Sequence, residues 1–136
     1  MAEKTIITTG KRKMSVARAH VKKGQGDVKI NDFPLSTWQP EYTRLRIREP
    51  LVIAGDLAKK VDISVKVRGG GKAGQSDAIR QSIAKGLLEF SGDEKLKKAF
   101  VEFDKNLLAY DNRRTEPHKP SRSRKGARRH KQRSKR

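Results

Sequence analysis

An α+β fold, in which several strands carry helices on one face, is predicted by three features of this sequence. Residues 15–23 and 61–68 alternate apolar and polar side chains with a period of two, which indicates half-buried strands. Residues 79–90 place apolar side chains at helical spacing instead, which indicates an amphipathic helix. The chain has 136 residues and no internal repeat, so these strands and helices are expected to share one layered core.

The N-terminal third of the chain predicts three strands. A first short strand covers residues 5–9, and a basic turn follows at residues 10–13. The strand at residues 15–23 has cations at alternate positions, which gives it a basic outer face. A strong turn signal at residues 24–27 is followed by residues 28–30, which are expected to close a hairpin with the preceding strand.

The middle of the chain predicts two short helices and one strand. A short helix is expected after Pro40. Pro50 is expected to begin a second helical segment, because proline fits the first turn of a helix and not its interior. Residues 61–68 then form the clearest strand of the sequence.

The remainder of the body predicts two more helices. One follows the glycine-rich stretch and runs to about Phe90, with Arg80 away from its apolar stripe. Asp93 is placed to cap the other. The apolar stripe of this last helix comprises Leu96, Ala99, Phe100 and Phe103.

The glycine-rich stretch at residues 69–76 has two interpretations. A strand, a G-x-x-x-x-G stretch and a helix form the layout of a nucleotide-binding P-loop, but Gln75 stands where that motif needs its lysine. Backbone N–H groups at a helix N-terminus also attract anions, and glycines allow a phosphate of RNA to come close. A tight strand-to-helix turn that needs positive φ angles is the structural alternative.

The C-terminal segment, residues 113–136, has the composition of an extended tail, separate from a globular domain at residues 1–112. It holds twelve Lys or Arg, one acidic residue and no large apolar residue, so its net charge is +11. Such a segment cannot bury enough surface to offset its ordering entropy, and it stays extended until a polyanion neutralises it. A solvated tail with a targeting or solubility role is the alternative.

The overall composition favours a nucleic-acid partner and excludes several other classes. The net charge is +19 with a pI near 10.7, which leaves +8 on residues 1–112, so both parts of the chain are basic. The chain has no cysteine, and its three histidines lack the spacing of metal ligands. No metal, cofactor or catalytic site is therefore expected. The absence of a signal peptide and of a membrane-spanning stretch favours a cytoplasmic location.

Five segments together carry a family resemblance. The longest is G-G-G-K-A-G-Q-S-D-A-I-R-Q-S-I-A-K-G-L at residues 69–87. The others are G-K-R-K at 10–13, I-N-D-F-P-L at 30–35, R-E-P-L-V-I-A-G at 48–55 and D-N-R-R-T-E at 111–116. This pattern closely resembles the universal small-subunit ribosomal protein nine family, in its archaeal or eukaryotic branch.

The resemblance implies a fold, partners and a role. It implies the ribosomal two-layer α+β domain with a left-handed β-α-β crossover. It also implies a structural protein without enzymatic activity, bound to ribosomal RNA in the head of the small subunit beside neighbouring head proteins. The C-terminal tail of the family threads through that RNA and meets tRNA in the P site. Arg133 occupies a position where an aromatic residue is common in the family.

The predicted contacts divide into two sets. Ribosomal RNA is expected to contact Lys11, Arg12, Lys13, Arg18, Gly69, Gly70, Gly71, Lys72, Gly74, Gln75, Arg80, Arg113, Arg114, Lys119, Arg122, Arg124, Lys125, Arg128, Arg129 and Lys131. The P-site tRNA is expected to contact Arg133, Ser134, Lys135 and Arg136. Two alternatives stay open: a free-standing RNA chaperone that uses the same arm, and a nucleotide-dependent enzyme of a related kinase-like fold.

Overall fold

A computed structural model describes residues 4–38 and 40–120 of the chain, and it confirms the α+β class. The strands are β1 (Ile6–Arg12), β2 (Ser15–Lys23), β3 (Val28–Ile30), β4 (Phe33–Pro34) and β5 (Val61–Arg68). The helices are α1 (Glu41–Ala54), α2 (Lys72–Ser91) and α3 (Glu94–Phe103). Short 3-10 turns are η1 (Leu35–Thr37), η2 (Gly55–Lys60) and η3 (Lys105–Leu107).

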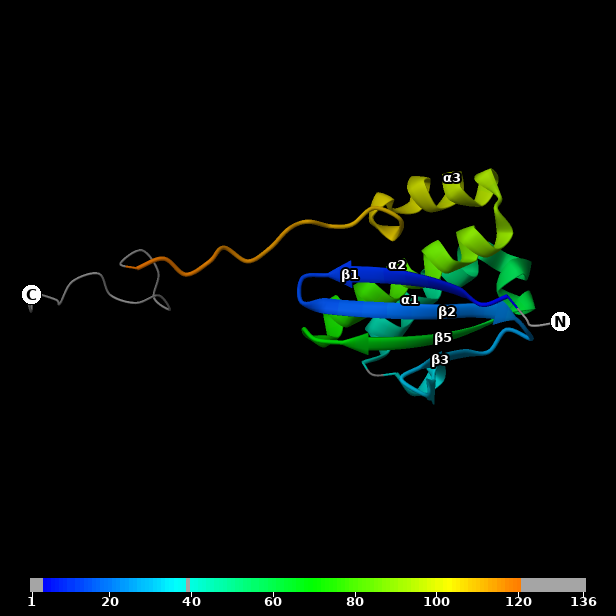
Figure 1. The fold of residues 1–136 in the computed structure, drawn as a ribbon, viewed down its shortest axis with the longest axis horizontal. Coiled ribbons are helices and arrows are strands. Elements are labelled where there is room, and N and C mark those ends of the chain that lie inside the picture. Colours follow the sequence, from blue (N-terminus) through cyan, green and yellow to red (C-terminus); the bar gives the residue numbers. More distant parts are fainter. Residues whose placement is uncertain (1–3, 39, 121–136) are drawn as a thin grey trace, which may run out of the picture.

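The five strands form one mixed sheet in the order β1-β2-β5-β3-β4 (Figure 1). β5 is antiparallel to β2 and parallel to β3, so β3, α1 and β5 form a β-α-β unit. The predicted hairpin between β2 and β3 is therefore wrong. The Ile63 N–H donates to the Asp27 carbonyl, and the Asp62 carboxylate accepts from the Gln25 and Asp27 N–H groups. These bonds hold the turn and β3 against β5.

β1 is longer than predicted, because it continues through the expected basic turn and reverses only after Arg12. Lys13 adopts a positive φ of 53° in the tight turn to β2. Gly10 lies inside the strand, where a Cβ would overlap the Ala78 carbonyl and the Ser82 nitrogen of α2. The absence of a side chain at Gly10 lets the strand lie directly against the helix, so this glycine serves packing rather than a turn.

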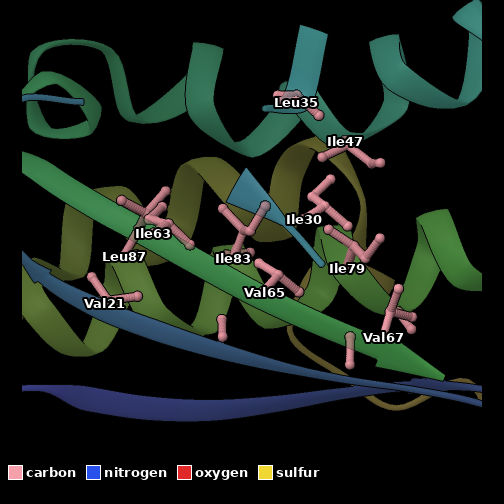
Figure 2. Packing of buried hydrophobic residues seen from close by; sticks show 14 of the residues in the cluster. Val21, Ile30, Leu35, Ile47, Ile63, Val65, Val67, Ile79, Ile83 and Leu87 are labelled. Atoms are coloured by element: carbon pink, nitrogen blue, oxygen red, sulfur yellow. The ribbon is translucent and has the colours of Figure 1, made fainter. Parts of the chain in front are cut away.

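The hydrophobic core lies between the sheet and the helices on one of its faces (Figure 2). α2 packs across β1, β2 and β5, and α1 packs against α2. Figure 2 shows the side chains of Ile63, Val65 and Val67 from β5 meeting Ile79, Ile83 and Leu87 from α2, with Ile47 of α1 nearby. No helix formed by residues 4–38 and 40–120 covers the opposite face of the sheet.

α1 is one continuous helix, so the prediction that Pro50 begins a second helix is wrong. Proline in a helix interior loses a backbone hydrogen bond and costs about 3 kcal/mol in an exposed helix. Pro50 is buried, as are Thr43 and Ile47 on the same helix face. Tertiary packing of this face therefore offsets the local cost of the proline.

The C-terminal helices agree with the sequence, with one exception. α2 ends one residue beyond Phe90, and Gly92 follows it with a left-handed φ of 63°. The Asp93 carboxylate accepts from the Lys95 N–H and caps α3, as predicted. Phe103, predicted to lie in the apolar stripe of α3, is the last residue of that helix and is 55% exposed, whereas Phe100 is buried.

Candidate nucleic-acid interface

The uncovered face of the sheet carries rows of cations. Strand pairing places Arg18 of β2 directly opposite Lys66 of β5, and it places Val16 of β2 between Lys11 of β1 and Arg68 of β5. These four cations are exposed. Their alternation with buried residues in each strand turns all of them toward the same side of the sheet.

This arrangement is unfavourable for the protein by itself. Like charges directly opposite on neighbouring strands destabilise a sheet. Among the outward-facing strand residues that the structure describes, Asp62 is the one carboxylate. Hydrogen bonds from the backbone N–H groups of Gln25 and Asp27 lower the pKa of Asp62 and occupy one of its oxygens. The face therefore keeps an uncompensated positive charge that an anionic partner would neutralise.

The first residues of the predicted tail are attached to the turn between β1 and β2. Asp111 forms a parallel bridge with Arg12, and the Arg12 guanidinium approaches its carboxylate to 3.5 Å. Arg113 donates to the same carboxylate, which lowers the pKa of Asp111 well below its usual range. Arg114 donates to the Lys13 carbonyl and to the Tyr110 hydroxyl, the latter at 2.6 Å. The direction in which the chain leaves the body is thus set by side chains of the body.

The glycine-rich turn lies against the same end of the molecule. Gly69 and Gly70 adopt positive φ angles of 79° and 67°, and the Ser15 hydroxyl donates to the Gly69 carbonyl at 2.9 Å. A Cβ on Gly70 would overlap the Ser15 hydroxyl, and one on Gly74 would lie 3.0 Å from it. The turn geometry therefore accounts for these three glycines, whereas Gly71 has an ordinary φ and open space around it.

Three basic segments consequently meet at one end of the sheet. The β1–β2 turn, the start of α2 and the departing C-terminal segment lie together there, and Figure 1 shows the C-terminal segment leaving from this end. Residues 112–120 form no helix or strand. We use the term basic face for the outward-facing strand residues together with the β1–β2 turn, the start of α2 and residues 112–120.

Comparison with known proteins gives the family. A model of the family described as ribosomal protein S9/S16 matches residues 10–136. The chain belongs to this family. It is 43% identical over 131 residues to proteins named small ribosomal subunit protein uS9 from Methanococcus vannielii and Methanococcus maripaludis. The alignments cover 96% of this chain and 98% of each relative.

Membership of the S9/S16 family confirms the resemblance and its archaeal-like character. The family consists of ribosomal proteins, which supports the prediction that the chain is not an enzyme. In the glycine-rich turn, the Gln75 side chain donates to the Gly69 carbonyl at 3.1 Å. No helix within residues 4–38 and 40–120 has the length and apolarity needed to span a membrane.

Arg80, which was predicted to contact ribosomal RNA, is buried inside the folded body. Its side chain is 6% exposed, donates to the Glu49 carboxylate and donates to Asp104 at 2.7 Å. Burial alone would lower the pKa of Arg80, but the hydrogen bonds to Glu49 and Asp104 outweigh burial and raise it. With its guanidinium held by two carboxylates, Arg80 is placed to join α1, α2 and η3 rather than to contact a phosphate.

Arg12 has a similar internal position. It lies in a polar cleft of about 360 Å³, with its side chain 15% exposed and 3.9 Å from Asp77. Arg46 approaches Asp77 on the other side to 3.0 Å as an ion pair, without hydrogen-bond geometry. Five cations and three carboxylates line this cleft, so it keeps a net positive charge although Asp77 is shared by Arg12 and Arg46.

Of the other predicted contacts, Gly74 and Gln75 are half-buried, and the rest are exposed or lie outside the described residues. Lys11, Lys13, Arg18, Lys72, Arg113, Arg114 and Lys119 are exposed. Arg122, Arg124, Lys125, Arg128, Arg129, Lys131, Arg133, Ser134, Lys135 and Arg136 lie outside the described residues. The alternation of Lys66 and Arg68 with Val65 and Val67 indicated that they face outward, but they were not among the predicted RNA contacts.

Proposed function

We propose that this chain is a structural constituent of the small ribosomal subunit in the cytoplasm, where residues 1–112 bind ribosomal RNA in the head and residues 113–136 extend through it. The observation that carries the RNA-binding role is the pairing of Arg18 with Lys66 on the uncovered face of the sheet. A protein that functioned alone would gain stability from an acidic residue at either position. The full-length match to relatives named small ribosomal subunit proteins supports the same assignment.

The basic face binds by charge and shape rather than by reading bases. Lys and Arg side chains neutralise phosphates and release counterions, which drives association with any closely packed RNA backbone. Few aromatic residues are present in the chain, so stacking on successive bases contributes little. Exposed Lys11, Arg18, Lys66 and Arg68 supply phosphate contacts over the strands, and Lys13 and Lys72 extend them to the glycine-rich turn.

The tail continues the interface beyond the body. Its arginines offer planar, bidentate donors to phosphates, and 24 fully extended residues would reach roughly 80 Å. Asp111, Arg113 and Arg114 attach its first residues to the β1–β2 turn, so the tail starts from a defined point. The last four residues, Arg133 to Arg136, contact tRNA in the P site.

Sedimentation of cell extracts tests the assignment to the subunit. We expect the chain at one copy per small subunit, in fractions that keep it after a high-salt wash. A free-standing RNA chaperone would instead remain outside the ribosomal fractions, and this result would overturn the proposed function.

A short deletion tests the tRNA contact separately. Removal of Lys135 and Arg136 should leave subunit assembly intact and accelerate the loss of tRNA from the P site. The control replaces Arg122 and Arg124 with Gln, which removes the same charge from the tail far from its end. Equal tRNA retention in the deletion and in the unaltered subunit would contradict a terminal contact.

A further inference from the structure

An exposed apolar stripe runs along α1, on the side of the helix away from the core. Tyr42, Leu45 and Val52 are 63%, 55% and 76% exposed, respectively. With Glu49 they have spacings of three, four and three residues, which places all four on one side of the helix. This is the spacing of a seam at which two helices pack. We call Tyr42, Leu45 and Val52 the α1 stripe.

The charges beside the stripe describe its partner. Arg48 is exposed next to Leu45 and Val52, and none of the ion pairs and hydrogen bonds found among the described residues includes it. Glu49 is committed to Arg80, and Arg46 is paired with Asp77. The stripe therefore offers apolar contact together with one available cation.

RNA fits this surface poorly. Phosphates and riboses would leave the three apolar side chains facing polar groups, and Arg48 supplies a single charge. The cations that suit RNA lie on the sheet, and the helices cover the other face of that sheet. The two surfaces have different chemistry and belong to different layers of the molecule.

A second copy of the chain also fits poorly. In a two-fold pair of α1 helices packed along the stripe, the symmetry axis would cross the helix midway between Tyr42 and Val52. Arg46 and Arg48 of one copy would then lie close to those of the other. The net charge of +19 on each chain adds further repulsion. A different protein that presents a carboxylate has neither disadvantage.

We propose that the α1 stripe binds an amphipathic helix of a neighbouring protein in the small ribosomal subunit, with the apolar face of that helix on Tyr42, Leu45 and Val52 and one of its carboxylates on Arg48. This inference rests on the proposed function, because it takes the partner from the same subunit. Helix-in-groove contacts of this kind use apolar anchors three, four and seven residues apart.

Photo-cross-linking in purified small subunits tests the proposal. The amino acid p-benzoylphenylalanine is introduced in place of Leu45, of Val52, or of Lys66 as the control on the sheet. We expect Leu45 and Val52 variants to cross-link to the same neighbouring protein and the Lys66 variant to cross-link to RNA. Cross-links from α1 to RNA or to a second copy, or no cross-link from α1, would overturn the proposal.

A charge exchange provides the second measurement. Arg48→Glu should reduce the protein cross-link from position 45 several-fold, whereas Arg48→Lys should preserve most of it. An equal yield of the protein cross-link in both variants would show that no carboxylate of the partner contacts Arg48. The experiments distinguish a failure of the proposed function from a failure of the α1 contact. Absence of the chain from small subunits would overturn both. Presence of the chain there, with α1 cross-linked to RNA, would overturn only the α1 contact.

Discussion

At the scale of single residues, Arg80 shows how burial changes the meaning of a charge. In the sequence it is one of 34 cations in a basic chain. In the structure it joins Glu49 of α1 to Asp104 just after α3. A helical pattern places Arg80 away from the apolar stripe of α2, but it does not reveal that two carboxylates from distant segments enclose the guanidinium.

Replacement of Arg80 by Met should destabilise the protein without a direct loss of RNA contacts. The two carboxylates would lose their partner while 28% and 31% exposed, so we expect a loss of about 2–4 kcal/mol, below the highest values for fully buried pairs. Urea denaturation measures the change, and Lys97→Met on α3 is the control for an exposed cation. If the variant kept its stability but lost affinity for RNA, this result would indicate that Arg80 contacts RNA directly.

The pH dependence of that variant follows from Asp104. Burial alone would raise the pKa of Asp104, but the Asn106 N–H and the Arg80 guanidinium lower it below its ordinary value of 3.8. The stability that this carboxylate contributes is therefore complete above pH 3.8 and is lost as the pH falls through the lower folded-state pKa. Without Arg80 the folded pKa rises, so the stability difference between the two proteins should narrow below about pH 4 in denaturation measured across pH.

Gly10 and Gly71 should respond in opposite ways to the same added methyl group. Gly10→Ala should cost about 1–3 kcal/mol or more, because its Cβ would overlap backbone atoms of α2. Gly71→Ala should cost less than about 1 kcal/mol, because its Cβ would meet open space at the N-cap. Thermal unfolding of both variants measures the difference, and equal losses would contradict the close contact between β1 and α2.

At the scale of secondary-structure elements, the pairing of β2 with β5 creates the basic face. Each strand shows its alternation in the sequence, but neither shows its neighbour. β3 has three residues, too few for its alternation to specify which strand it joins. The insertion of β5 between β2 and β3 brings Arg18 and Lys66 together, and it is this contact that makes the surface suitable for a polyanion.

Removal of one charge from this pair should change stability and RNA binding in opposite directions. Lys66→Gln relieves the repulsion with Arg18, so the isolated protein should gain about 0.2–1 kcal/mol at low salt. Its affinity for small-subunit ribosomal RNA should fall, with a salt slope smaller by roughly 0.7–0.9. Thermal unfolding and filter binding measure the two effects.

The matched control is Lys97→Gln, which removes an exposed charge from α3. It should change RNA affinity less than Lys66→Gln and leave the sheet unaffected. If both variants lose the same affinity, the binding depends on net charge alone and not on the basic face.

At the scale of the whole molecule, the positive charge is divided between the folded body and the C-terminal segment, residues 113–136. Binding should therefore depend steeply on salt. With about eight phosphate contacts, a plot of log K against log salt concentration should have a slope of about −6 to −7. Removal of residues 121–136, which hold nine of the cations, should reduce that slope markedly. A slope near zero for the full chain would contradict an electrostatic mechanism.

The sequence by itself determined the class of the molecule, most of its strands and helices, and the family. These features follow from local information: the period of two in β2 and β5, the helical period in α2, the cap at Asp93 and the motif at residues 69–87. The separation of residues 113–136 from the body stays a prediction from composition, because a segment without large apolar residues has nothing to bury.

Only the tertiary structure decided which local preferences would be overruled and which charges would stay exposed. Pro50 remains inside α1, Gly10 serves packing in β1, and Arg80 is enclosed while Lys66 faces outward. The physical reason is that strand pairing and burial depend on contacts between segments far apart in the chain. Their free energy exceeds the local preferences that a sequence pattern reports.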